Sequence, residues 1–153
     1  MLPTDQRHAL SMQRQKIRIP SRPTTAKLTI VDIGRWTLEP RAGLESLLTA
    51  GRINIEAVHM LRRLAELIEQ LGQMRPAFHL DTKCVWSLLQ AIEAGAVVDE
   101  EEISANLSWL GQATAILRTI ERDDYRVALS RIVKVAEIRV LMHASLIPRR
   151  ITV

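Results

Sequence analysis

The chain has 153 residues, and its content of 47% apolar and 25% charged residues is ordinary for one globular domain. Its single cysteine excludes an internal disulfide, and the lack of a long apolar run argues against a membrane-spanning segment. The formal net charge of +4 is uneven, because residues 1–53 hold nine basic and four acidic side chains while residues 54–153 are close to neutral.

The beginning of the chain predicts a basic arm, residues 1–36, ahead of a helical domain, residues 37–153. No acidic residue lies between Asp5 and Asp32, and the segment between them is rich in Ser, Thr, Gln and Pro. Few apolar side chains are present there to dock a helix, so we expect the arm to be flexible. Its candidate nucleic-acid contacts are Arg7, Arg14, Lys16, Arg18, Arg22 and Lys27.

Such an arm can neutralise phosphates and so bind nucleic acid weakly and without sequence preference. Aromatic residues for base stacking are absent beside these cations, and the chain shows no zinc finger, RNP motif or convincing helix-turn-helix. An ordinary solvated tail explains the same composition. An organelle transit peptide is disfavoured because Pro20 and Pro23 interrupt the amphipathic helix that it requires.

Three helices are expected in the first part of the domain. Pro40 suits the first turn of a short leading helix that ends at Gly51. Asn54 is a good N-cap for a second helix, which is apolar along one side and cannot continue past Pro76. Asp81 is the expected cap of a third helix, which ends at Gly95.

Two more helices are expected toward the carboxyl terminus. Asp99 and Glu102 resemble a capping box, and the last helix is expected from about Asp123 to Leu146. One continuous helix from Asp99 to Leu146 is the alternative, since no Gly or Pro separates the two expected helices. In such a helix, however, Asp124 would lie on the buried apolar side without a partner for its charge. The predicted fold is all-α: a four-helix bundle-like body with a short leading helix and a flexible basic arm.

The last two helices are apolar over an unusually wide arc. A helix that is apolar nearly all round must be covered nearly all round. Either the last helix is the centre of the monomer, or part of this surface packs against a second chain, since large exposed apolar patches are unusual in monomers. The interface candidates are Trp109, Ile116, Ile120 and Tyr125. Trp86 of the third helix is a further candidate, because it lies off the main stripe of its helix; packing under the N-terminal segment is the alternative.

Arg139 and His143 interrupt the apolar face of the last helix at i, i+4 spacing. A buried Arg139 requires a carboxylate, which Glu66 or Glu93 could supply. The pair is either structural or a ligand-binding or pH-sensing site, because the helix dipole favours the cationic form of His143.

Signals for chemistry are weak elsewhere. His79, Asp81 and Cys84 lie within six residues, but a structural zinc site usually needs four Cys or His ligands. Asp81 as a cap and Cys84 as a small packed residue explain this set. Nucleotide-binding, hydrolase and metalloprotease motifs do not occur in the sequence. We therefore expect no cofactor, no metal and no enzymatic activity.

Taken together, the sequence favours a small non-enzymatic protein that acts through helix-mediated contacts, as a homodimer or with another protein partner. The excess of arginine over lysine is typical of G+C-rich coding and indicates a bacterium. Lack of a secretion signal and the lone cysteine favour the cytoplasm, with no membrane partner. A nucleic-acid-associated regulator that uses the basic arm is the alternative, and a ligand or enzyme site at Arg139 and His143 is the third hypothesis.

Overall fold

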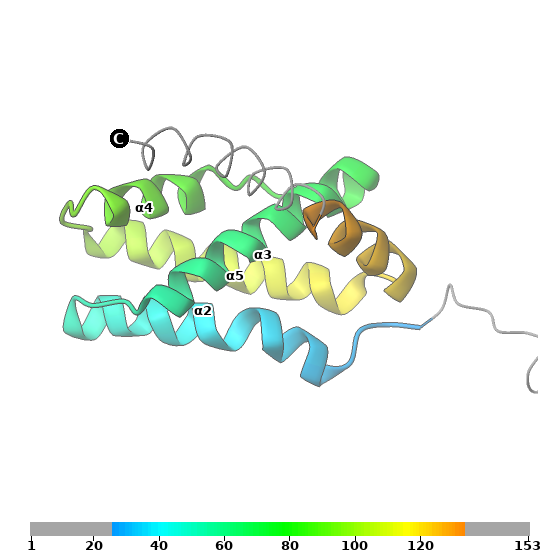
Figure 1. Cartoon of the computed structure of the whole chain (residues 1–153), viewed down its shortest axis with the longest axis horizontal. Coiled ribbons are helices and arrows are strands. Elements are labelled where there is room, and N and C mark those ends of the chain that lie inside the picture. Colours follow the sequence, from blue (N-terminus) through cyan, green and yellow to red (C-terminus); the bar gives the residue numbers. More distant parts are fainter. Residues whose placement is uncertain (1–25, 134–153) are drawn as a thin grey trace, which may run out of the picture.

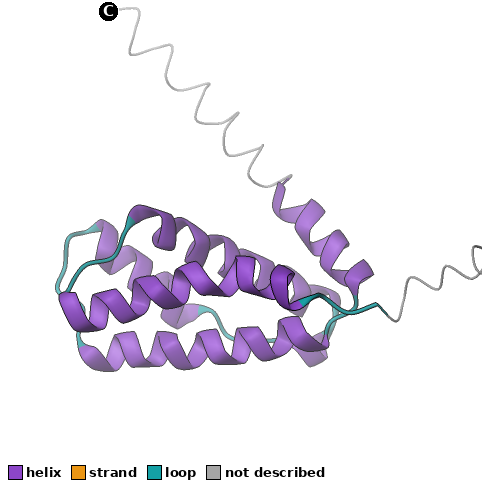
Figure 2. Ribbon diagram, turned by 90° about the horizontal axis from the view of Figure 1, so that it is seen from below, coloured by secondary structure: helices purple, strands orange, loops and turns teal. Residues whose placement is uncertain are grey.

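The computed structural model describes residues 26–133, and these form an all-α, bundle-like body (Figure 1). Its elements are α2 (Ile30–Ala50), α3 (Ile55–Met74), the 3-10 turn η2 (Pro76–Phe78), α4 (Lys83–Glu93) and α5 (Glu100–Thr119). A further helix begins at residue 122 and reaches residue 133, the last one described. It rises from the end of the bundle at which the chain enters (Figure 2). The predicted all-α, bundle-like architecture is confirmed for these residues.

The leading helix is long, not short, and the prediction that it begins near Pro40 is wrong. α2 begins after a capping box, in which Thr29 Oγ1 accepts from the Asp32 N–H at 3.1 Å and the Asp32 carboxylate accepts from the Thr29 N–H at 3.2 Å. Pro40 lies inside the helix and is buried. The predicted boundary between residues 36 and 37 falls within α2, where Trp36 is buried in the core.

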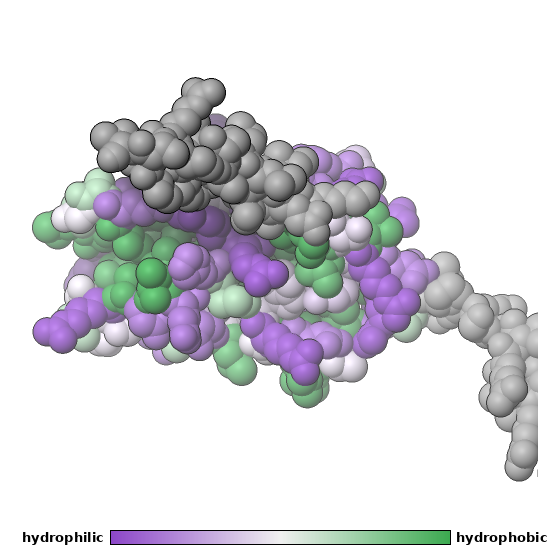
Figure 3. All heavy atoms as spheres, viewed as in Figure 1, coloured by the Kyte–Doolittle hydropathy of each residue, from purple (hydrophilic) through white to green (hydrophobic). Residues whose placement is uncertain are grey.

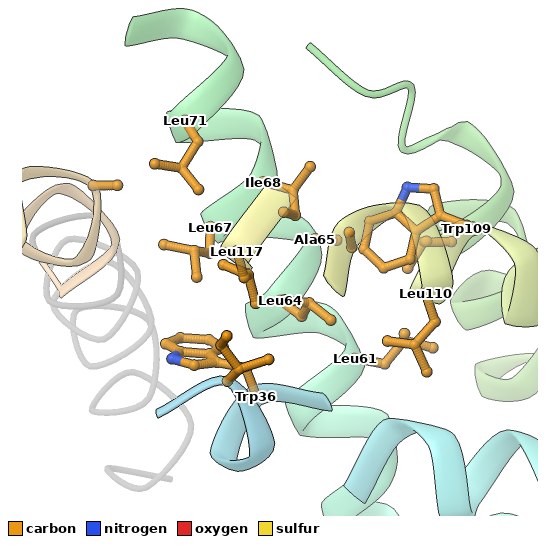
Figure 4. Packing of buried hydrophobic residues seen from close by; sticks show 14 of the residues in the cluster. Trp36, Leu61, Leu64, Ala65, Leu67, Ile68, Leu71, Trp109, Leu110 and Leu117 are labelled. Atoms are coloured by element: carbon orange, nitrogen blue, oxygen red, sulfur yellow. The ribbon is translucent and has the colours of Figure 1, made fainter. Parts of the chain in front are cut away.

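α3 supplies the largest share of the core. Its N-cap is Asn54, as predicted, and Asn54 Oδ1 accepts from the Ala57 N–H at 2.7 Å. Figure 4 shows its leucines lying between the indole rings of Trp36 on α2 and Trp109 on α5. Full burial of one leucine stabilises by roughly 1.5–3 kcal/mol. The buried side of α3 consists of Ala57, Leu61, Leu64, Ala65, Leu67, Ile68 and Leu71.

α4 begins one residue later than its predicted cap implies. The N-cap position is held by Thr82, which makes no capping hydrogen bond with its side chain. Asp81 instead accepts from the Lys83 N–H at 2.9 Å, two residues along the chain. Asp81 therefore fixes the turn that precedes the helix rather than the helix end itself.

α5 begins as predicted and ends at Thr119, two residues before the next helix. Asp99 accepts from the Glu102 N–H at 2.8 Å. After Thr119 the backbone of Ile120 is extended, with φ −70° and ψ 152°, so the two helices are separated by a turn. Asp124, just beyond that turn, receives the Arg75 Nε–H at 2.7 Å. The turn thus gives this half-buried carboxylate a partner.

α2 and α3 approach each other closely at Gly43. A Cβ added at residue 43 would lie 2.4 Å from the Ala57 Cβ and 3.1 Å from the Ile53 Cγ1. Because real Cβ atoms do not come that close, any larger residue would push the two helices apart.

We expect Gly43→Ala to lower the free energy of unfolding by about 1–3 kcal/mol, because overpacking outweighs the gain in helix propensity. Gly111→Ala is the matched control: it is also within a helix, and a Cβ there meets nothing within 4 Å. The control should raise stability by about 0.5–1 kcal/mol. Urea unfolding of both variants measures the difference, and equal stability of the two would contradict this account of the contact.

The Asp32 carboxylate predicts a pH dependence. Hydrogen bonds from Thr29 chiefly, with help from the charge of Arg122, hold the pKa of Asp32 below its ordinary value. A lowered pKa in the folded state stabilises above the ordinary pKa and stops doing so as pH falls through the lowered value. Asp32→Asn should therefore be less stable than the unmodified chain at neutral pH, and the gap should shrink below about pH 4. Urea unfolding across this pH range tests it; a gap independent of pH would refute it.

Candidate interaction surface

The structure corrects the expectation that α5 offers an apolar surface to a second chain. Trp109 is 3% exposed and Ile120 is fully buried. Both belong to the same core as the leucines of α3, and Figure 4 shows the Trp109 ring beside Ala65 of that helix. Ile116 is half-buried and packs against this core.

Trp86 and Tyr125 are half-buried, and their polar atoms are used within the chain. Trp86 Nε1 donates to Glu69 Oε1 at 2.6 Å, and the same oxygen accepts from Thr82 Oγ1 at 2.7 Å. Trp36 Nε1 donates to the Tyr125 hydroxyl at 2.9 Å, with the two rings edge to face. These hydrogen bonds join α3 to α4 and α2 to the helix that begins at residue 122.

Among the candidate nucleic-acid contacts, Lys27 lies within the described residues. Its Nζ donates to the Thr119 carbonyl at 2.8 Å, at the carboxyl end of α5, where the helix dipole favours a cation. Lys27 also pairs with Glu121 in an antiparallel bridge, and the Arg122 N–H donates to the Ala26 carbonyl at 2.8 Å. Residues 26–28 are therefore attached to the body. The other candidates lie outside the described residues: Arg7, Arg14, Lys16, Arg18 and Arg22.

Arg139 and His143 also lie outside the described residues. Of the two carboxylates considered for Arg139, Glu93 forms an ion pair with Arg62 of α3. Glu66 has an interaction of its own within the chain. Of these two carboxylates, Glu93 is therefore already paired within the described residues.

The group formed by His79, Asp81 and Cys84 has no metal-binding arrangement, and the same holds for every His, Cys, Asp and Glu between residues 26 and 133. Burial raises the pKa of the Cys84 thiol, which disfavours the reactive thiolate. A cavity of about 410 Å³ adjoins His79 and Asp81, but the Glu69 oxygen beside it already accepts from Thr82 and Trp86.

The solvent-facing side of α2 carries large apolar side chains. Val31 is 64% and Leu38 is 68% exposed. Together with Gly34 and Ala42 they recur at spacings of three and four residues, so all four lie along one side of the helix, away from α3 and α5. Figure 1 places α2 at the lower edge of the body, and apolar side chains protrude along this edge in Figure 3. We call these four residues the α2 stripe.

The α2 stripe alternates large and small residues. Leu38 leans back over Gly34, and its Cδ1 lies 3.3 Å from the place that a Cβ of residue 34 would occupy. On one flank, Arg35 and Glu39 line a shallow groove of about 430 Å³ shared with α3. The surface is thus an apolar ridge with charged residues on this flank.

No family model, curated protein or solved structure matches this chain. None of the helices within residues 26–133 combines the length and the hydropathy that crossing a bilayer requires.

Proposed function

We propose that the protein is a small, non-enzymatic interaction module that associates with itself through the α2 stripe. The observation that carries the proposal is the exposure of Leu38, 68%, in the middle of a well-formed helix between Gly34 and Ala42. An apolar ridge with a charged flank is typical of surfaces that bind other proteins. The stripe replaces the surface of α5 that the sequence favoured.

The size of this surface predicts a modest affinity. A stable interface of ordinary size buries about 800 Å² on each partner, and one helix face of three turns supplies less. In a twofold dimer each contact occurs twice, so two copies of Leu38 and Val31 would be covered. We therefore expect a dimer whose population depends on protein concentration.

A non-catalytic role is supported by what the polar side chains do. Those around the cavity between α3 and α4 hold the two helices together through Glu69, and burial disfavours the thiolate of Cys84. A bacterial source, a cytoplasmic location and weak nucleic-acid binding by the basic arm stay predictions from composition.

We expect Leu38→Glu to weaken self-association at least tenfold, because it places two buried charges at the centre of the contact. Its folding stability should change little, since the side chain is mostly exposed in the single chain. Sedimentation velocity over a range of concentrations measures association, and urea unfolding measures stability.

Val97→Glu is the matched control, because Val97 is 98% exposed and lies in the loop between α4 and α5. It introduces the same charge away from the α2 stripe and should leave association unchanged. If the unmodified chain is monomeric up to millimolar concentration, or if both variants weaken association equally, the proposed function is wrong.

A further inference from the structure

We infer that the second copy lies antiparallel on the α2 stripe, with each large residue opposite a small one. The inference rests on the proposed self-association and adds the orientation and register of the two α2 helices. Along the helix the stripe reads Val31, Gly34, Leu38, Ala42, which is large, small, large, small.

An antiparallel twofold pairing brings together residues that lie equally far from one central point on the helix. Val31 and Ala42 have their midpoint between residues 36 and 37, and Gly34 and Leu38 have theirs at residue 36. These points differ by half a residue, less than about 1 Å of helix rise. One register therefore sets Val31 against Ala42 and Leu38 against Gly34, each pair formed twice.

A parallel pairing lacks this fit. It would set Leu38 against Leu38 and Gly34 against Gly34 of the second copy, so that a bulge alternates with a gap along the contact. Close packing requires projections to fill depressions, and mismatched volumes leave voids or strain.

Charges on the flank favour the same orientation. Arg35 and Glu39 lie on the same side of the stripe, along the groove shared with α3. In the antiparallel register, Arg35 is offset from Glu39 of the second copy by only about 2 Å along the axis, closer than it is to Arg35 of that copy. In a twofold parallel pair the two copies of this flank would lie on opposite sides of the contact, so Arg35 and Glu39 would not meet across it. Charge complementarity of this kind selects orientation more than it adds affinity.

Disulfide trapping of the full chain tests the register. In a Cys84→Ser background, which removes the natural thiol, one preparation carries Val31→Cys and the other carries Ala42→Cys. Mild oxidation of the mixture should join the two different chains, because the paired positions lie within disulfide reach. Each preparation alone should form at least tenfold less dimer, because equal positions then lie about 16 Å apart along the helix axis. The Cys84→Ser chain without added cysteine reports the background.

The outcomes separate this inference from the proposed function. If Leu38→Glu abolishes association but each single-cysteine preparation joins to itself, the pairing is parallel and only the inference is overturned. If the unmodified chain never associates, or associates regardless of Leu38→Glu, both are overturned. If a Leu38→Cys monomer resists a thiol reagent, other residues of the same chain cover the stripe, and this result also overturns both.

Discussion

Burial of one side of α3 is the constraint on which the rest of the structure depends. α2 and α4 pack against α3, and its leucines share one core with Trp36, Trp109 and the helix that begins at residue 122. Hydrophobic burial of this kind has no direction of its own, so the caps and close approaches decide how the helices lie. Asn54 caps the start of α3, and the absence of a side chain at Gly43 lets α2 approach α3 closely.

The length of α2 follows from a balance between local preferences and this core. Pro40 costs the helix one hydrogen bond and crowds the preceding turn, an effect of about 3 kcal/mol in an isolated helix. The capping box at Thr29 and Asp32 and the burial of Trp36 offset it. Since the helix thereby extends ahead of the proline, Val31 and Gly34 join Leu38 and Ala42 on one side, and the outer stripe is created.

Local signals were enough to predict the fold class and several helix ends. Asn54 and Asp99 are caps as expected, and Asp124 correctly argued for a turn after α5. The start of α2 differs from the prediction because Pro40, which suits a first turn, lies inside the helix. Thr29 followed by Asp32 is the sequence signal that marks the true start. The burial of Trp109 and Ile120 could not be foreseen, because it depends on how the other helices pack around α5, and periodicity carries no information about that. The α2 stripe could not be predicted either, because Val31, Gly34 and Leu38 precede the start expected for this helix.

The hydrogen bonds from Lys27 to Thr119 and from Arg122 to Ala26 have a mechanical consequence. They attach residues 26 and 27, which precede α2, to the carboxyl end of α5 and the start of the following helix. Tension applied to the chain ahead of residue 26 would therefore be borne first by the corner between α5 and the following helix, with the Thr29 cap shielded behind it. A force on the leading segment would therefore act on this corner before it reaches α2 and its exposed apolar side chains.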